Sequence, residues 1–473
     1  MTLGAAEGWP AVVVIGGGLA GLAAAVALGS SGCRVDLFEA RRWLGGRAAS
    51  FRDPTTGELV DHCQHVSMGC CTNLADFCRR TGMNAFFRRD RTLHFVGPDG
   101  RQYPLQAAAW LPAPLHLMRG FWSLKYLSIR DRVQIARAMW KLMRLRVVDD
   151  DRGPTVGQWL DEQGQSANAI ERFWGVILVS ALGERLDRAS LAAARKVLVD
   201  GFLAAREAYT IEIPEAPLST LYGERLQSWF AAHQVAVHLN TPIREVTCDA
   251  GPVVIQADGA RLRPDFVVIA LPWSKIGDLL PAEIASQWAW LGAIGSLGAA
   301  PITGVHLWFD RPLTALPHAV LVGRLSQWIF NRGQRATESA VGHYYQVVIS
   351  ASRELAGRDR GEIVAEVCGE LAAIWPAAAA AKLLHARVVT EHAAVFSARP
   401  GLDRLRPPQQ TSTPGLFLAG DWTATLWPAT MESAVRSGYL AAEAILKSVG
   451  RPRPFLVADL PRGLLARLLI KTA

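Results

Sequence analysis

Residues 12–51 read VVVIGGGLAGLAAAVALGSSGCRVDLFEARRWLGGRAASF, and the first eighteen of them carry no charge. A membrane helix needs about 20 apolar residues, so length alone allows one. Three consecutive glycines at residues 16–18 would break such a helix, however, and the β-branched run before them favours a buried strand. Nothing basic precedes the stretch, which argues against a secretion signal. The sequence therefore predicts a strand, a glycine turn, a helix and a second strand over residues 34–40.

This order places Gly16, Gly18 and Gly21 where a dinucleotide-binding fold needs them. The first glycine permits a tight turn, the second lets the backbone approach a pyrophosphate, and the third lets the helix pack closely on the strand. The phosphates then lie at the helix N-terminus. Glu39 follows about 20 residues later, where a carboxylate accepts hydrogen bonds from a ribose. A bound dinucleotide is therefore predicted.

Two further segments indicate which dinucleotide it is. The segment RRWLGGR (41–47) resembles the second glycine motif of the large flavoprotein family that holds amine oxidases, protoporphyrinogen oxidase and phytoene desaturases. The segment GLFLAGDWTATLWPATMESAVRSGYLAAEAIL (415–446) resembles the part that closes the FAD site in that family. The resemblance implies that Asp421 bonds the ribityl chain or a phosphate, and that a helix starting near Pro428 points at the flavin. A helix N-terminus favours the anionic reduced flavin.

A third piece, HLNTPIREVTCD followed by FVVIALPW, resembles the strand whose backbone touches adenine, with Ile243 as the expected contact. The predicted cofactor is FAD. The residues expected to bind it are Gly16, Gly18, Leu19, Ala20, Gly21, Glu39, Ala40, Arg41, Gly45, Gly46, Arg47, Ile243, Gly420, Asp421, Ala429, Thr430 and Met431.

The fold class predicted for these 473 residues is α/β, with a Rossmann-like FAD-binding domain and an inserted α+β substrate domain. Because the FAD segments are scattered, the FAD-binding domain is expected over residues 1–82, 219–297 and 388–450. The substrate domain is expected over 83–218 and 298–387, and residues 451–473 form an amphipathic tail.

Charge and cysteine content restrict the partners. The net charge is +8, but only seven of the fifty basic residues are lysine and the arginines are dispersed. Nucleic acid is therefore not expected, and an anionic membrane surface is preferred. Cys63, Cys70, Cys71 and Cys78 match no zinc spacing, so no metal is expected. We expect a cytoplasmic protein, peripheral on the inner face of the cell membrane.

The chain departs from amine oxidases at one position. Many of them hold a lysine near flavin N5, and counting back from Arg311 and Pro312 puts that position near Gly304. No lysine lies between Lys275 and Lys382. Amine oxidation is therefore disfavoured.

A narrower resemblance is to hydroxysqualene dehydroxylases, which remove an allylic hydroxyl to give squalene. It rests on VDHCQHVSMGCCTNLADFCRRTGM (60–83), SQWIFNRG (326–333) and RPPQQTSTPGLFLAGDWTATLWPATMESAVRSG (406–438). Two departures stand out: Asp-His-Cys where Asp-Asn-Gly is expected before Gln64 and His65, and Leu426 where glycine is expected. The resemblance implies a polyprenoid lipid substrate, hydroxysqualene, and possible association with squalene-synthase-like pathway enzymes.

Such a reaction needs an acid, a pocket that tolerates an allylic cation, and a hydride from reduced FAD. The candidate catalytic residues are His65 as the acid, Gln64 as a holder of the hydroxyl, and Trp427 as an aromatic face for the cation. Asp61 and Glu432 are fallback acids.

Three alternatives stay open at this point. The first is a carotenoid desaturase of the phytoene type, and the second is a non-catalytic flavin-binding partner in lipid synthesis. The third concerns the membrane: the helical, apolar and basic stretch 111–148 and the tail 451–473 either lie on a bilayer or pack on the protein itself.

Overall fold

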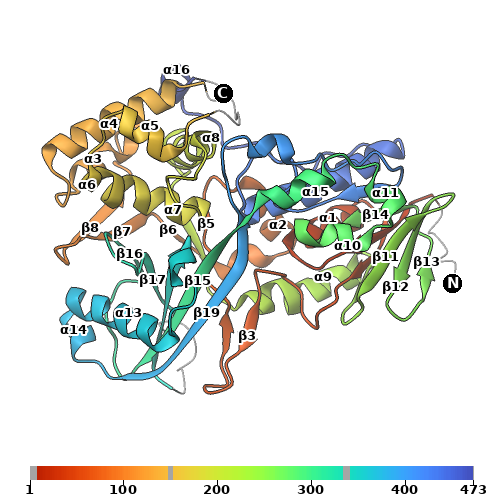
Figure 1. The fold of residues 1–473 in the computed structure, drawn as a ribbon, viewed down its shortest axis with the longest axis horizontal. Helices are drawn as coiled ribbons and strands as arrows, with labels where there is room; N and C mark the ends of the chain where they lie inside the picture. The colour runs from red at the N-terminus through yellow and green to blue at the C-terminus, as the bar shows by residue number, and fades with distance from the viewer. Residues whose placement is uncertain (1–7, 147–152, 334–340, 472–473) are drawn as a thin grey trace.

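The computed structural model describes residues 8–146, 153–333 and 341–471. Parts of four predicted segments lie outside the described residues: 1–7 of the FAD-binding domain, 147–148 of the helical stretch, 149–152 and 334–340 of the substrate domain, and 472–473 of the tail. Figure 1 shows two adjoining parts, one built on the strands near the N-terminus and one that holds most of the middle of the chain.

A five-stranded parallel sheet forms the base of the first part, in the order β10-β2-β1-β14-β20. Its strands are β1 (Ala11–Ile15), β2 (Arg34–Phe38), β10 (Val235–His238), β14 (Phe266–Ile269) and β20 (Leu416–Leu418). Successive side chains of a strand point to opposite faces. Val12 and Val14 accordingly join one hydrophobic cluster, and Val13 and Ile15 join another. Both faces of the sheet are therefore buried, which explains the uninterrupted apolar run of β1.

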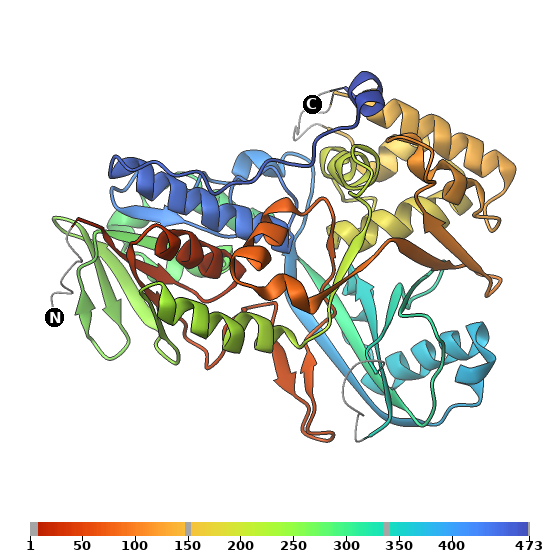
Figure 2. The same ribbon diagram turned by 180° about the vertical axis from the view of Figure 1, so that it is seen from behind.

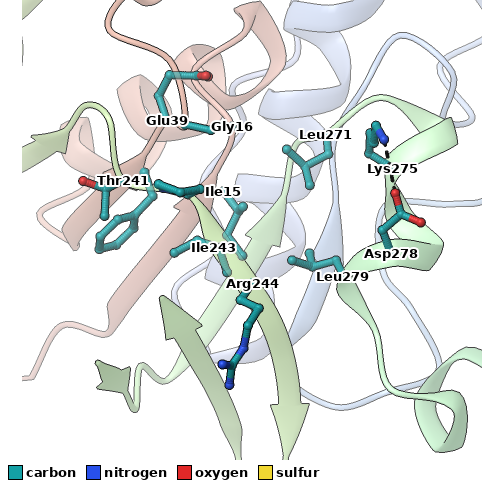
Figure 3. Close-up of a pocket in the computed structure, with 13 residues that line it drawn as sticks. Ile15, Gly16, Glu39, Thr241, Ile243, Arg244, Leu271, Lys275, Asp278 and Leu279 are labelled. Atoms are coloured by element: carbon teal, nitrogen blue, oxygen red, sulfur yellow. Dashed lines mark hydrogen bonds and ion pairs between the residues drawn. The ribbon is translucent and has the colours of Figure 1, made fainter. Parts of the chain in front are cut away.

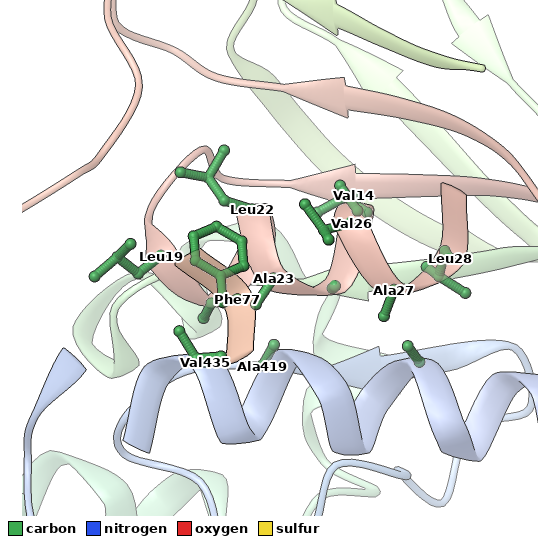
Figure 4. Close-up of a cluster of buried hydrophobic side chains, with 14 of the residues drawn as sticks. Val14, Leu19, Leu22, Ala23, Val26, Ala27, Leu28, Phe77, Ala419 and Val435 are labelled. Carbon is green, nitrogen blue, oxygen red and sulfur yellow. The ribbon is translucent and has the colours of Figure 1, made fainter. Parts of the chain in front are cut away.

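Four helices share the first cluster: α1 (Leu19–Ser30), α2 (Thr72–Arg80), α9 (Leu226–Ala232) and α15 (Met431–Ser448). Figure 4 shows α1 lying along α15, with Leu19 and Val435 at the same end. The second cluster is covered by a three-stranded antiparallel sheet and three short helices. These are β11 (Ile243–Cys248), β12 (Pro252–Gln256), β13 (Arg261–Leu262), α10 (Ile276–Leu279), α11 (Ala282–Ala285) and α12 (Leu291–Ile294).

The second part contains a seven-stranded sheet in the order β19-β15-β18-β17-β16-β7-β8, antiparallel except between β16 and β7. The strands are β7 (Thr92–Val96), β8 (Gln102–Gln106), β15 (Ala299–Phe309), β16 (His318–Leu321), β17 (Trp328–Asn331), β18 (His343–Ser350) and β19 (Leu383–Phe396). The long strands β15 and β19 run between the two parts (Figure 1).

Helices and two small sheets complete this part. The helices are α3 (Met118–Trp122), α4 (Ile129–Arg144), α5 (Val156–Glu162), α6 (Ala167–Ala169), α7 (Val176–Leu182), α8 (Leu191–Arg195), α13 (Arg360–Ile374) and α14 (Pro376–Ala379). One small sheet pairs β3 (Ser50–Arg52) with β4 (Leu59–Asp61), and the other joins β5 (Ser67–Met68), β9 (Ile211–Pro214) and β6 (Phe87–Asp90).

The predicted fold class is confirmed: a Rossmann-like parallel sheet is combined with a part that mixes helices and a largely antiparallel sheet. The domain boundary predicted at 387/388 falls inside the continuous strand β19.

The tail ends in α16 (Leu464–Leu469), which Figure 2 shows beside one end of α4. None of the helices in the described ranges combines the length and the apolar character that a bilayer crossing needs.

Candidate active site

The glycine turn between β1 and α1 is tightly built except on one side. Gly16 has a φ of +108°, and a Cβ there would lie 2.6 Å from the carbonyl oxygen of Ala270. A Cβ on Gly21 would lie 2.0 Å from the carbonyl oxygen of Gly16. Gly18 differs, because a Cβ there would meet no atom within 4 Å. This open side lies at the N-terminus of α1, which begins at Leu19. A diphosphate fits there against the free backbone N–H groups.

A cavity of about 220 Å³ lies beside this turn (Figure 3). It is lined by Ile15, Gly16, Phe38, Glu39, Ala40, Thr241, Pro242, Ile243, Arg244, Leu271, Lys275, Asp278 and Leu279. The walls are mostly apolar, which suits an adenine ring, and the Glu39 carboxylate lies at one end, near the glycine turn (Figure 3). Gly16, Glu39 and Ile243, predicted from three places in the sequence to bind FAD, therefore line one cavity, together with Ala40.

Glu39 also organises the turn itself. Its Oε2 accepts a hydrogen bond from the Gly17 N–H at 2.8 Å, and its Oε1 accepts one from the Arg41 N–H at 2.9 Å. Each carboxylate oxygen can accept a second hydrogen bond. The carboxylate is therefore held in place and still able to accept hydrogen bonds from a ribose.

The second glycine motif packs directly on the first. The Gly45 N–H donates to the Gly17 carbonyl at 2.8 Å, and Gly45 bridges to Gly18. A Cβ on Gly46 would lie 3.1 Å from the Cα of Gly18. Gly45 and Gly46 have φ values of +101° and +61°, a region that favours glycine. The close approach of the two glycine motifs places Arg47 at the same site.

Arg47 joins this site to the end of the chain. Its Nη2 lies 2.7 Å from Oδ1 of Asp421, and its Nη1 donates to the Ala394 carbonyl of β19 at 2.7 Å. Asp421 is 4% exposed. The predicted Gly-Gly-Arg and Gly-Asp segments therefore meet, as a dinucleotide spanning both would require.

The closing helix α15 begins at Met431, three residues after the predicted start at Pro428, because Thr430 caps it by accepting from the Ser433 N–H. A Cβ on Gly438 would lie 2.3 Å from the Ala20 carbonyl oxygen of α1, so the two helices cross in close contact. With Leu19 and Val435 at the same end in Figure 4, the two N-termini face the same side. Two positive helix ends there favour an anionic cofactor.

The predicted Gln64 and His65 lie in the loop after β4. Gln64 is buried; its Nε2 donates to the His65 carbonyl at 2.9 Å, while its Oε1 has no hydrogen-bond partner. His65 Nδ1 lies 2.9 Å from the Cys63 carbonyl, which fixes the proton on Nδ1 and leaves Nε2 as an acceptor. Burial lowers the pKa of His65 below its ordinary value. Burial therefore favours the neutral imidazole and works against the acid role that the sequence predicted for His65.

The two fallback acids have structural hydrogen bonds instead. Asp61 accepts from the Ser50 hydroxyl at 2.7 Å and is buried. Glu432 accepts from the Leu74 N–H at 2.8 Å, at the start of α2, and pairs with Arg436 at 2.7 Å. Both carboxylates stabilise junctions between segments, so neither is free to act as an acid.

Trp427 contacts the protein's own cations. Lys196 Nζ lies 4.7 Å from its ring centroid, and the Arg436 guanidinium lies 4.9 Å from it. The ring also packs with Cys70 and Ala208 in a small buried cluster. The aromatic role predicted for Trp427 toward a substrate cation therefore has no support here, because cation–π contacts within the protein already occupy the ring.

Leu426 shows why a glycine is expected at this position. It adopts a φ of +62°, which is unfavourable for a branched side chain, and it is 82% exposed. An apolar side chain held in that conformation beside the closing segment points outward rather than into the core.

Gly304, near the predicted position of the amine-oxidase lysine, is surrounded by polar groups of neighbouring residues. A Cβ there would lie 3.0 Å from the His62 carbonyl oxygen, 3.4 Å from Gln346 Nε2 and 3.6 Å from His306 Nε2. A side chain at this position would therefore make one tight contact, with the His62 carbonyl, and would start beside two polar side chains. His306 is fully buried, and its Nδ1 lies 2.8 Å from the Tyr344 hydroxyl. Burial lowers the pKa of His306 to about 4.

His306, Tyr344 and Gln346 form a buried polar group beside Gly304 that the sequence argument did not identify. In the register of β15 and β18, His306 faces Gln346 and Trp308 faces Tyr344. The available signal was the alternation of Gly304, His306 and Trp308 on one face of an apolar strand.

The fold and the site define an FAD-dependent oxidoreductase. Residues 19–446 match the family described as flavin containing amine oxidoreductase, and the chain belongs to that family. Among solved structures, an oxidoreductase from Methanosarcina mazei superposes with a TM-score of 0.68 at 18% identity, over 92% of this chain and 100% of that one. Putrescine oxidase bound to putrescine gives a TM-score of 0.65 at 15% identity, over 93% and 99%. These two support the fold alone.

Curated relatives point to two reactions. The chain is 28% identical to the hydroxysqualene dehydroxylase of Rhodopseudomonas palustris, over 92% of this chain and 98% of that one. It is 27% identical to that of Zymomonas mobilis, with the same coverage. It is also 26% identical to the zeta-carotene desaturase of Synechocystis, over 95% and 99%. The resemblance to hydroxysqualene dehydroxylases is confirmed, and carotene desaturases are similar to the same degree.

Proposed function

We propose that the protein reductively removes the allylic hydroxyl of hydroxysqualene to give squalene. The allylic C–O bond breaks, a C–H bond forms, the oxygen leaves as water, and reduced FAD is oxidised. FAD, when bound and reduced, supplies the hydride. The residues of this chain hold the hydroxyl and deliver the proton.

The observation that carries the proposal is the buried, unpartnered Oε1 of Gln64. A buried acceptor without a donor costs about 1–3 kcal/mol. The hydroxyl of hydroxysqualene can donate to it, whereas a carotene is a hydrocarbon and offers no donor. Because the Nε2 of Gln64 is fixed on the His65 carbonyl, the amide cannot turn to remove the deficit. This favours a hydroxylated substrate over a carotene.

His65 is the proposed proton carrier. Its Nδ1 is fixed on the Cys63 carbonyl, so Nε2 is the nitrogen that gains a proton and passes it to the departing oxygen. Its lowered pKa makes the imidazolium a stronger acid than an exposed histidine. A leaving hydroxide is a poor leaving group, so a stronger acid is an advantage.

One specific observation favours a second candidate, desaturation of a carotenoid precursor: the zeta-carotene desaturase relative covers 95% of this chain. A neutral histidine would then accept a proton while the flavin accepts a hydride. Amine oxidation is not proposed, because this chain has Gly304 near the position where amine oxidases hold their lysine.

The two candidates are separated by parallel incubations of the purified holoprotein. One contains hydroxysqualene with dithionite, and the other contains phytoene or zeta-carotene with a quinone. Gas chromatography and mass spectrometry should find squalene in the first. Products in the incubation with phytoene or zeta-carotene alone would contradict dehydroxylation and support desaturation.

A polyprenoid substrate is nearly absent from water, so we also propose that the protein works at the inner face of the cell membrane. Its substrate would be collected from the bilayer or passed on by a squalene-synthase-like enzyme. This location agrees with the net charge of +8.

A further inference from the structure

Helix α4 has two apolar faces, and only one of them packs on the protein. Ile135, Ala138 and Leu142 are buried in the core of the second part. On the opposite side, Ile129, Val133, Ala136 and Trp140 follow a spacing of four, three and four residues, which lines them up along one face. Ile129 is 70% exposed and Trp140 is 43% exposed. A helix on the surface of a water-soluble protein normally carries polar side chains on the face that points to solvent.

The C-terminal helix α16 repeats this arrangement. Ala466 and Ile470 are buried in the same core, and the Lys471 N–H donates to the Met143 carbonyl of α4 at 3.0 Å. The face of α16 that contains Ala466 and Ile470 therefore packs on the protein itself, which was one of the two alternatives for the tail. Leu464 and Leu468, one turn apart on the other face, are 82% and 79% exposed.

Helix α16 lies next to the two segments that carry the other exposed apolar residues, the end of α4 and the loop around Ala113. Gly463, which precedes α16, lies so close to Ala113 that a Cβ on Gly463 would be 3.7 Å from the Ala113 Cβ. Trp110, in the same segment as Ala113, is 73% exposed. Figure 2 shows α16 against the end of α4. We call Trp110, Ile129, Trp140, Leu464 and Leu468 the α4–α16 surface.

The segment that contains α4 is strongly basic. Residues 107–146 contain eight arginines and lysines and one acid, Asp131. Asp131 is buried in the capping box of α4 and contributes little outside. The Arg144 guanidinium lies 5.4 Å from the centre of the Trp140 ring. Tryptophan beside arginine is the combination that favours the headgroup region of a bilayer.

We propose that the α4–α16 surface docks on an anionic lipid bilayer. A nucleic acid would be attracted by the arginines but gains nothing from exposed leucine and isoleucine, whereas a bilayer binds both kinds of side chain. The proposal rests on the proposed function in one respect: a polyprenoid substrate explains why the protein would bind a membrane, because such a substrate must be collected there. It adds which face of the protein meets the lipid.

The test is sedimentation of the flavin-loaded full chain with vesicles of phosphatidylcholine, with and without 30% phosphatidylglycerol, at low salt. We expect Ile129→Ser/Leu464→Ser/Leu468→Ser to reduce the bound fraction at least tenfold on both vesicle types. Arg137→Gln/Arg144→Gln should reduce binding to the anionic vesicles only. The control, Leu384→Ser/Leu456→Ser, changes two exposed leucines elsewhere, at the start of β19 and early in the tail. It should bind as the unchanged protein does.

Equal binding by the triple variant and the control would overturn the proposal. So would a concentration-dependent dimer in solution that the triple variant abolishes, because a second copy would then cover the surface. Flavin absorbance and thermal unfolding verify that each variant is folded. Turnover of hydroxysqualene in detergent micelles, which needs no bilayer, is expected to be the same in all variants. If neither the unchanged protein nor any variant turned over hydroxysqualene in micelles, the proposed function would be contradicted. The vesicle-binding result would still test the docking surface.

Discussion

Arg47 and Asp421 lie 374 residues apart in the sequence and are joined by an ion pair of 2.7 Å. The pair connects the second glycine motif to the segment before α15, and so holds together the two ends of the predicted FAD site. A hydrogen bond to a charged group is worth about 1.5–3 kcal/mol. We expect Asp421→Ala to weaken FAD binding by about 10- to 100-fold, measured as the Kd for FAD added to the stripped protein.

The matched control for this prediction is Asp249→Ala, which removes an aspartate from an exposed ion pair with Arg263 at 3.5 Å. That variant should bind FAD normally, since exposed pairs contribute little. A full flavin content in purified Asp421→Ala would remove Asp421 from the cofactor site.

Gly18 and Gly21 should respond to the same substitution in opposite ways. Gly18→Ala places a methyl group in open space, so the stripped protein should keep its Tm while FAD binding falls at least tenfold. Gly21→Ala drives a Cβ against the Gly16 carbonyl, so it should lower the Tm or prevent folding. Differential scanning fluorimetry with and without FAD compares them. Unchanged FAD affinity in Gly18→Ala would show that the diphosphate does not approach this turn.

His65→Ala should leave the flavin content near normal and slow turnover at least tenfold. Burial holds the pKa of His65 below its ordinary value, so the protonated fraction grows as the pH falls. Turnover of the unchanged protein should therefore rise toward acidic pH, and this limb of the pH profile should vanish in His65→Ala. The control His343→Ala alters an exposed histidine on β18 and should retain the limb. An unchanged rate in His65→Ala would make His65 a structural residue.

His116 predicts a pH dependence of stability. Both ring nitrogens are buried without a hydrogen-bond partner, and burial, with the charge of Arg206, lowers its pKa to about 4. Between pH 4 and 6.5 the unfolded state binds more protons, so the free energy of unfolding falls as the pH drops below 6.5. The loss is on the order of 2 kcal/mol at pH 5.

Replacing His116 by phenylalanine removes this titration and the two unpartnered nitrogens. We expect His116→Phe to have a higher Tm than the unchanged protein at pH 5, and a smaller difference at pH 8. Thermal unfolding followed by circular dichroism measures both. A difference that is the same at the two pH values would exclude His116 as the titrating group.

The FAD-binding segments could be predicted because each is encoded locally. A glycine that needs φ > 0, or one that would place a Cβ against backbone, leaves its mark at a single position, and Gly16, Gly21 and Gly45 are of this kind. The polar group of His306, Tyr344 and Gln346 could not be predicted in this way. It depends on the register between β15 and β18, which the sequence does not state.

Two other sequence-based interpretations changed for a similar reason. The prediction of His65 as the acid used the pKa of a histidine in water, whereas burial lowers the pKa of His65 in the folded protein. Trp427 was predicted to face a substrate cation, although Lys196, from a distant part of the chain, and Arg436, from the following helix, contact its ring. Side-chain surroundings of this kind are properties of the tertiary fold.

The most direct test of the proposed reaction is a single turnover under argon. The holoprotein is photoreduced, mixed with hydroxysqualene in detergent micelles, and followed at the absorbance of oxidised flavin while squalene is quantified. We predict about one squalene per flavin reoxidised, and slower reoxidation in Gln64→Leu. Reduced flavin that persists with hydroxysqualene, together with oxidised protein that becomes reduced on addition of phytoene, would contradict dehydroxylation.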